Sequence, residues 1–142
     1  MKVILDQLTA GVVFTGDIAK DVVTFLMSHG CPRTAMHSAA VATEAQRIAA
    51  AVGIAPHTAA QAGWLHDVSA VIPMEERVAA AEALAIPVLA EERALPMILH
   101  QKLAATLARD LFGVTNAEVL NAIGCHTTLK AGASTLDKVL FV

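Results

Sequence analysis

The hydrophobic positions of this chain never alternate with polar ones along a run of Val, Ile or Thr, which is the pattern of a half-buried strand. Neither Asn-Gly nor Asp-Gly, the dipeptides that mark tight hairpins, occurs in the sequence. Alanine and leucine, which are strong helix formers, dominate instead. The pattern predicts an all-α domain.

Glycine and proline divide the chain into candidate helices, because glycine suits the left-handed residue after a helix and proline suits the first turn. A Glu- and Ala-rich segment opens at Pro73 and is interrupted by Pro87. The other expected helices run from Asp17 to the residue before Gly30, from Pro32 to the residue before Gly53, from Pro56 onward and carrying Trp64, His66 and Asp67, from Pro96 through Phe112, from Asn116 to about His126, and from Ser134 to Val142.

The length of 142 residues is common for one domain and is sufficient to bury a sizeable core. No linker, repeat or low-complexity tract divides the sequence, so residues 1–142 are expected to form a single domain. The formal net charge of −3 provides no broad basic field for nucleic acid or an anionic membrane. A small soluble substrate or a protein partner is favoured, and the hydrophobic surplus is compatible with a homodimer.

The segment from Ile48 to Val71 contains a single charged side chain, Asp67, and invites a membrane interpretation. The segment is rich in alanine but is broken by Gly53 and Pro56, and its histidines are costly in hydrocarbon. Closely packed helices of a soluble protein are therefore expected. The apolar run before Asp6 is too short for a signal peptide, so we expect a cytoplasmic location.

The candidate metal ligands are histidines and one aspartate rather than cysteines. Cys31 and Cys125 lie far apart and form no Cys-x-x-Cys pair, which indicates neither a disulfide framework nor a thiolate zinc site. Imidazole and carboxylate are the usual ligands of catalytic first-row metals, and helices of a bundle can present them to its interior. Five residues have small or apolar neighbours and are expected to face inward as metal ligands: His37, His66, Asp67, His100 and His126.

The adjacent pair His66 and Asp67 is the most specific element of this set. Neighbours on a helix point about 100° apart, so they can serve one metal only at a helix end or around a metal pair. Asp67 is the natural bridge between two ions roughly 3.5–4 Å apart, which would generate a metal-bound hydroxide for attack on a phosphoryl group. A single histidine is more simply a hydrogen-bonded core residue, but the whole set favours metal binding.

Five segments of the chain resemble the HD-domain superfamily of metal-dependent phosphohydrolases, and more narrowly its YqeK-type family. They are HSAAVATEAQRIAAAVGI, AAQAGWLHDVSA, LHQKLAATLARDLFGV, EVLNAIGCHTT and STLDKVLFV, and they cover the chain from about Thr34 to its end. Members of that family hydrolyse diadenosine tetraphosphate symmetrically to ADP. The resemblance implies an HD-domain helical bundle with the metal site in its core.

The resemblance also implies how the ligands are shared between two metal ions. His37, His66 and Asp67 would hold one ion, and Asp67, His100 and His126 would approach the second. The family typically uses iron. Imidazole and carboxylate also accept manganese, cobalt or zinc, so the residues alone leave the metal open.

The family pattern places a last aspartate ligand just beyond Val142, which suggests that the natural protein continues past this sequence. Asp137 is an alternative ligand within the chain. However, Ser134-x-x-Asp137 also matches a capping box, which has a structural role at a helix start. We favour the capping role.

Several residues depart from the family pattern for phosphate binding. Ala40 and Ala70 stand where an arginine and a lysine are usual, and Gln101 and Lys102 replace glycine and proline. A polyanionic substrate normally needs cationic side chains in addition to metals. Lys102 and Lys130 are the candidate substrate-binding residues, although a solvated surface position is the commoner fate of a lysine.

The residues and the resemblance together predict a metal-dependent hydrolase of phosphoanhydride or phosphoester bonds in a nucleotide-type substrate, with Asp67 as the catalytic residue. Diadenosine tetraphosphate is the substrate that the resemblance implies. Three alternatives stay open: a non-catalytic nucleotide-binding or regulatory module, a di-metal oxygenase on the same fold, and a purely structural bundle. Trp64 could stack on a base, but core packing is the better expectation because residues two apart face different sides of a helix.

Overall fold

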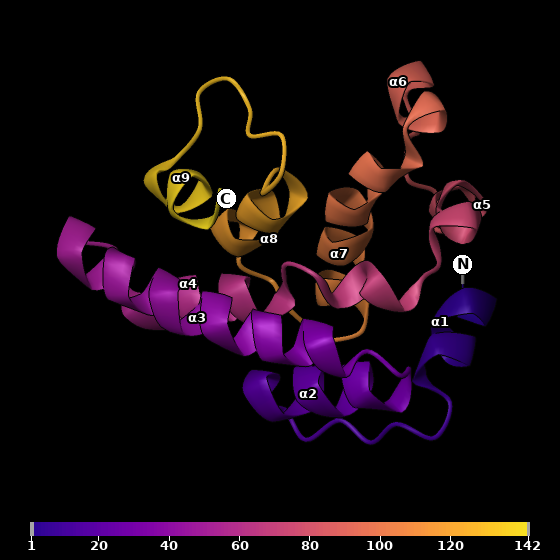
Figure 1. Ribbon diagram of the computed structural model, residues 1–142, viewed down its shortest axis with the longest axis horizontal. Coiled ribbons are helices and arrows are strands. Elements are labelled where there is room, and N and C mark those ends of the chain that lie inside the picture. Colours follow the sequence, from indigo (N-terminus) through magenta and orange to yellow (C-terminus); the bar gives the residue numbers. More distant parts are fainter. Residues whose placement is uncertain (1, 142) are drawn as a thin grey trace.

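The computed structural model describes residues 2–141, and every regular element in that range is helical (Figure 1). The α-helices are α1 (Lys2–Thr9), α2 (Ile18–Ser28), α3 (Pro32–Val52), α4 (Pro56–Leu65), α5 (Arg77–Ala83), α6 (Ala90–Ala94), α7 (Leu99–Asp110), α8 (Ala117–Gly124) and α9 (Thr135–Leu140). Short 3₁₀ helices are η1 (Val68–Val71), η2 (Met74–Glu76) and η3 (Pro96–Ile98). The all-α class is confirmed.

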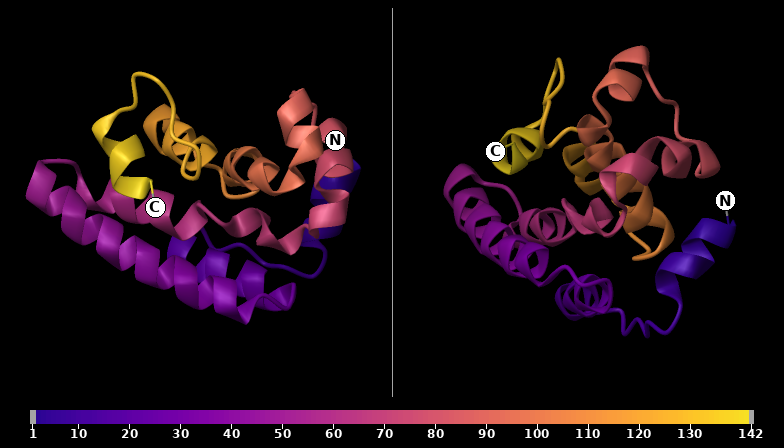
Figure 2. Two further views of the ribbon diagram at one scale, coloured as in Figure 1. Left: turned by 45° about the horizontal axis from the view of Figure 1, so that its top comes forward. Right: turned by 45° about the vertical axis from the view of Figure 1, so that its right-hand side comes forward.

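Helix α4 occupies the centre of the fold, where it contacts α2, α3, α7, α8 and α9. Figure 2 shows α2 and α3 along one side of α4, with α7, α8 and α9 across from them. The chain leaves α4 through η1, which packs against α7 and α2. The end of α4 therefore lies between the two layers of helices.

Helices α3 and α4 pack closely because their facing residues are small. Gly63 of α4 lies against the backbone of α3, and a Cβ placed on Gly63 would be 2.7 Å from Cα of Ala42. The inward face of α3 is formed by residues with little or no bulk beyond Cβ: Ala35, Ser38, Ala42, Ala45 and Ala49. This close approach sets the distance between any side chains that the two helices present to a common site.

Most helix starts agree with the sequence prediction. Asp17 caps α2 by accepting a hydrogen bond from Lys20 N, and Asn116 caps α8 in the same way from Glu118 N. Ser134 and Asp137 form the expected capping box at α9. Pro32 and Pro56 each lie in the first turn of their helix, and Gly53 ends α3 in a left-handed conformation.

Some helix ends differ from the prediction. Helix α4 ends at Leu65, so His66 and Asp67 lie at and just beyond its end rather than within it. Helix α7 ends at Asp110, because the chain bends into a closing turn in which Phe112 N donates to Leu107 O. Phe141 is already extended, so α9 stops before Val142, which lies outside the described residues.

Helix α1 was not expected from the sequence. It is joined to α2 by a hydrogen bond between His29 Nε2 and Leu8 O.

Trp64 is half-buried and packs against the hydrophobic core, as expected. Over residues 2–141 no helix is both long enough and apolar enough to cross a bilayer.

Candidate metal centre

Four helices bring the five candidate ligands together where α4 ends. His37 comes from the second turn of α3, while His66 and Asp67 follow the last residue of α4. His100 lies in the first turn of α7, and His126 follows α8 by two residues. The residues that follow α3 in the sequence thus all lie at helix termini: His66 and Asp67 at the end of α4, His100 at the start of α7 and His126 after the end of α8. We refer to these residues as the histidine–aspartate cluster.

The cluster consists of two groups that share Asp67. On one side, His37 Nε2 and His66 Nε2 lie 3.2 Å apart, and Asp67 Oδ2 lies 3.4 Å and 3.1 Å from them. On the other side, His126 Nε2 lies 3.0 Å from His100 Nε2 and 3.5 Å from Asp67 Oδ1. Within each group the ligand atoms lie within 4.8 Å of one another, so each group can hold one metal ion.

Three of the histidine rings are oriented by main-chain carbonyls three residues earlier. Nδ1 of His66 donates to Gly63 O at 2.7 Å, and Nδ1 of His126 donates to Ile123 O at 2.7 Å. Nδ1 of His100 likewise donates to Met97 O at 2.5 Å. A carbonyl oxygen can only accept, so each neutral ring carries its proton on Nδ1 and leaves Nε2 bare.

This tautomer makes the contact between His100 and His126 informative. Two unprotonated Nε2 atoms at 3.0 Å bring their lone pairs close together; the Thr127 hydroxyl, 3.0 Å from His100 Nε2, can donate to one of them, and a cation bound by both rings would remove the repulsion. A carboxylate oxygen of Asp67 faces the same space and adds negative charge. The donor set therefore fits divalent first-row cations, which prefer imidazole and carboxylate ligands.

The titration behaviour of the cluster follows from the charge of Asp67. Burial alone would raise the pKa of Asp67, but when the rings of His126 and His66 are protonated on both nitrogens, their hydrogen bonds and positive charges hold it far below its usual range. Burial would lower the pKa of His66, but its hydrogen bond with Asp67, the carboxylate charge and Gly63 O raise it overall. Burial lowers the pKa of His100. Asp67 is thus ionised at neutral pH.

The cluster is open on the side of His37. His66 and His126 are buried, and Asp67 and His100 are partly exposed. The expectation that all five residues face inward is wrong for His37, whose side chain is 53% exposed. Its Nε2 atom nevertheless lies 3.2 Å from His66 Nε2, so His37 forms the solvent-accessible edge of the first group of ligands.

The HD-domain family model matches residues 34–142, a range that includes the whole histidine–aspartate cluster. The chain belongs to the HD-domain family. The family assignment agrees with the resemblance found in the sequence, at the level of the superfamily.

Two further comparisons relate this HD domain to other proteins. Over 81 residues the chain is 47% identical to a protein of Lactococcus lactis subsp. cremoris described as an uncharacterized protein in the pepC 5′ region; the match spans 57% of this chain and 42% of that protein. The fold is similar to the crystal structure of a predicted HD superfamily hydrolase involved in NAD metabolism from Clostridium acetobutylicum. That similarity has a TM-score of 0.80 at 26% identity and covers 91% of this chain and 67% of the other.

Arg77 is a cation near the metal centre of this HD domain that the sequence did not reveal. Its Nε donates to Ile72 O at 3.3 Å, and its Nη1 donates at 3.5 Å to Met97 O, the carbonyl that also orients His100. Burial lowers the pKa of His100, and the nearby charge of Arg77 lowers it further. Burial also lowers the pKa of Arg77, while the charge of Asp67 acts in the opposite direction and raises it. Arg77 forms no ion pair with a carboxylate in the described structure.

Gln101 is a second residue that sequence reasoning missed, although it was noted as a departure from the family. Its buried side chain accepts hydrogen bonds from Thr127 N and Thr128 N at 3.0 and 3.3 Å. Its amide nitrogen donates to Thr128 Oγ1 at 2.9 Å. Gln101 therefore fixes the chain that follows His126, and only its contacts across 26 residues reveal this role.

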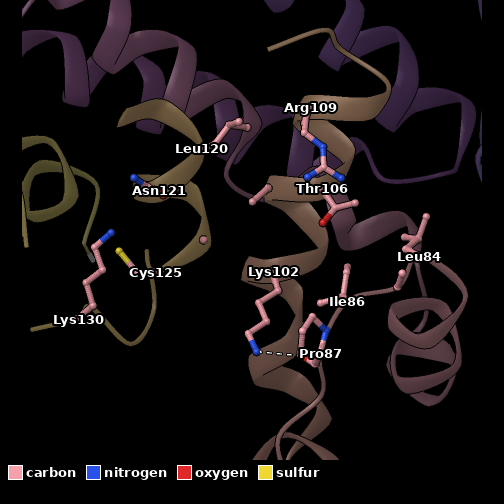
Figure 3. Close-up of a pocket in the computed structure, with 13 residues that line it drawn as sticks. Leu84, Ile86, Pro87, Lys102, Thr106, Arg109, Leu120, Asn121, Cys125 and Lys130 are labelled. Atoms are coloured by element: carbon pink, nitrogen blue, oxygen red, sulfur yellow. Dashed lines mark hydrogen bonds between the residues drawn. The ribbon is translucent and has the colours of Figure 1, made fainter. Parts of the chain in front are cut away.

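The structure does not place Lys102 and Lys130 in the histidine–aspartate cluster. Both line a separate pocket between α7 and α8 (Figure 3). Lys102 Nζ bonds Glu92 Oε1 at 2.8 Å, and Lys130 Nζ lies 3.6 Å from Asp137 Oδ2. Asp137 is buried within its capping box and belongs to neither group of candidate ligands.

Proposed function

We propose that this HD domain is a metal-dependent phosphohydrolase that cleaves phosphoanhydride or phosphoester bonds in a nucleotide-type substrate. The observation that carries the proposal is the sharing of Asp67 between two histidine pairs. Its two carboxylate oxygens face different pairs, Oδ2 toward His37 and His66 and Oδ1 toward His126. Such a bridging carboxylate is suited to a pair of cations, which is a recurrent arrangement for phosphoryl hydrolysis.

The ligands would be shared as the two groups suggest. His37, His66 and Asp67 would hold one ion, and Asp67, His100 and His126 would hold the other. When bound, the metal pair would supply Lewis acidity to the phosphoryl group and lower the pKa of water. Iron is the metal we favour from the family resemblance, with manganese, cobalt and zinc as chemically compatible alternatives.

The protein residues would prepare this site in three ways. The carbonyls behind the rings of His66, His100 and His126 keep each Nε2 available as a ligand atom. Asp67 is ionised at neutral pH and brings its negative charge between the two groups of histidines. Arg77, which has no carboxylate partner among residues 2–141, would attract the phosphate groups of the substrate toward the His100 side.

Diadenosine tetraphosphate is the first substrate to test. It follows from the family resemblance, and a polyphosphate would extend beyond the metals toward a cation such as Arg77. The described relative from Clostridium acetobutylicum is a predicted hydrolase involved in NAD metabolism, so dinucleotides such as NAD belong in the same panel. The proposed location is cytoplasmic, and the proposed ligand is a small molecule rather than nucleic acid.

The test combines metal analysis with a nucleotide panel. Purified protein should contain first-row metal and release phosphate or a nucleotide from at least one substrate. Asp67→Asn removes the bridging charge at almost constant shape and should lower kcat/KM by about 10²-fold or more, with loss of bound metal. The matched control is Asp6→Asn on the exposed side of α1, which should change neither quantity.

Full activity and unchanged metal content in Asp67→Asn would contradict the proposal. Nucleotide binding without turnover in the metal-loaded protein would support a regulatory module instead. Oxygen consumption with an organic substrate, in place of phosphate release, would support a di-metal oxygenase. Circular dichroism of each variant separates loss of the site from loss of the fold.

A further inference from the structure

A pocket of about 540 Å³ lies between α7 and α8 and is bordered on the α7 side by the turn after α5 (Figure 3). Helix α7 contributes Lys102, Thr106 and Arg109 to it, and α8 contributes Leu120 and Asn121. The size falls within the range of pockets that enclose small-molecule ligands, roughly 300–1,000 Å³. No part of this pocket is used by the proposed hydrolysis.

The two faces of α7 separate this pocket from the metal centre. Residues at positions 102, 105, 106 and 109 follow the i, i+3, i+4, i+7 spacing of one helix face, and all four line the pocket. His100 lies two residues before Lys102, about 200° away around the helix. The buried residues Leu103 and Leu107 lie on the core side of α7. A ligand in the pocket therefore meets a different surface of α7 from the one that presents His100.

The lining of the pocket is cationic. It includes Lys102, Arg109 and Lys130 but no Asp or Glu. Each cation has an acidic neighbour outside the lining, namely Glu92, Asp110 and Asp137 respectively. Arg109 donates from Nε and Nη2 to Asp110, its neighbour in sequence, but its own side chain is 57% exposed and its Nη1 is not used in this pair. Lys130 Nζ lies 3.6 Å from the carboxylate of Asp137, beyond ordinary hydrogen-bond distance. These two cations retain donors for an anion in the pocket.

The lining also contains apolar side chains on both sides of the pocket. Leu84, Ile86 and Pro87 follow α5 and lie beside α7, and Leu120 lies across from them on α8. The hydroxyl of Thr106 on α7 and the amide of Asn121 on α8 add groups that can form hydrogen bonds with a ligand. The combination suits a molecule with a phosphorylated end and a flat or apolar end.

We propose that the pocket between α7 and α8 is a second ligand site, separate from the metal centre, that binds a nucleoside phosphate or a molecule of the same chemistry. Arg109 and Lys130 offer donors to the phosphate groups from the two sides of the pocket, and Leu84, Ile86 and Leu120 offer apolar contacts to the base or its equivalent. The site lies next to the chain segment that carries Cys125 and His126. A ligand bound in this pocket can therefore influence the metal centre through α8.

The test maps ADP binding by chemical shift in zinc-loaded, isotopically labelled protein. ADP should shift the amide signals of Thr106, Arg109 and Asn121, whether or not the protein hydrolyses any substrate. Pyrophosphate and adenosine, which represent the two ends of ADP, should each bind more weakly than ADP at these residues. Raising the salt concentration should weaken ADP binding, because the site is electrostatic.

Two substitutions test the cations directly. Arg109→Ala and Lys130→Ala should each weaken ADP binding at these residues by about tenfold, the effect of losing one charge-assisted hydrogen bond. The matched control is Arg47→Ala, which removes an exposed arginine paired with Glu44 on α3 and far from the pocket. It should leave the affinity unchanged.

Three outcomes would overturn the proposal. They are no binding of ADP, shifts confined to residues around His37 and Asp67, and unchanged affinity in both pocket variants. Failure of hydrolysis with normal ADP shifts at Thr106 and Asn121 would contradict the proposed function but not this site. Thermal unfolding of each variant shows whether the fold is retained.

Discussion

Gly63→Ala provides a direct test of the packing that brings α3 and α4 together. The added Cβ would lie 2.7 Å from Cα and 2.9 Å from N of Ala42, and 3.1 Å from the carbonyl carbon of Val41. These are backbone atoms, which cannot turn aside as a flexible side chain can. The substitution must therefore separate the two helices or distort one of them.

The magnitude is the balance of two effects. Alanine is favoured over glycine within a helix by about 1 kcal/mol, which would stabilise the variant. Overpacking against backbone costs up to about 3 kcal/mol, so the net loss is about 2 kcal/mol. For 142 residues the entropy of unfolding is about 0.3 kcal/mol per kelvin, which converts this loss into a fall in Tm of about 7 °C.

The assay is thermal and urea unfolding of the metal-free protein, with Gly124→Ala as the control. Gly124 is also helical, but a Cβ there would meet only Ala105 Cβ at an ordinary 3.8 Å. We expect this control to be neutral or up to about 1 kcal/mol more stable. If Gly63→Ala is as stable as the control, the close approach of α3 and α4 is not what constrains position 63.

The same substitution should weaken metal binding. His37 belongs to α3, whereas His66 follows α4 and is oriented by the carbonyl of Gly63. Separation of the helices would lengthen the distance between the two rings, which share one group of candidate ligands. Titration with zinc should show weaker binding in Gly63→Ala and unchanged binding in Gly124→Ala.

Two further predictions concern stability. Ala85 adopts a left-handed conformation (φ 58°) in a Schellman motif, in which Ile86 N donates to Ala81 O and Ala85 N donates to Glu82 O. Because this conformation favours glycine, Ala85→Gly should stabilise the fold by about 1 kcal/mol. A lower Tm in the variant would contradict this prediction. Burial would raise the pKa of Asp21, but hydrogen bonds donated by Thr15 and Gly16 lower it overall. The ionised Asp21 should therefore stabilise the folded protein above about pH 4, and this contribution should be lost as the pH falls through the pKa of the folded state. Asp21→Asn should therefore destabilise the protein at pH 7 in urea unfolding, with a difference from wild type that narrows below about pH 4; a constant difference would refute the assignment.

Local signals in the sequence were sufficient for most helix starts. Asp17, Asn116 and Ser134 cap their helices through bonds within three residues, so their roles depend on short segments alone. The ends of α4 and α5 carried no such signal. Helix α4 stops at Leu65 without glycine or proline, and α5 closes through Ala85, a residue that seldom adopts a left-handed conformation.

In the candidate site, too, features that depend on local sequence could be predicted and features that depend on distant contacts could not. The residue types and the pair His66 and Asp67 were sufficient to name the five members of the cluster, which the structure brings together. Arg77 and Gln101 were missed because their roles depend on contacts across 20 or more residues. For the same reason the sequence could not show that Lys102 and Lys130 line another pocket.

The carbonyls of Gly63, Met97 and Ile123 have a consequence for how variation in this protein should be interpreted. Metal-binding histidines are often held by a carboxylate or amide side chain, which a substitution can remove. Here the acceptor is a main-chain oxygen, which every amino acid provides. Saturation mutagenesis should therefore find position 97, whose side chain is exposed, permissive to any residue that preserves the turn, whereas position 123 is restricted by the burial of Ile123 in the core and not by its carbonyl. Transplanting this centre into another scaffold would require two correctly ended helices and one correctly started helix rather than a copied outer ring of polar side chains.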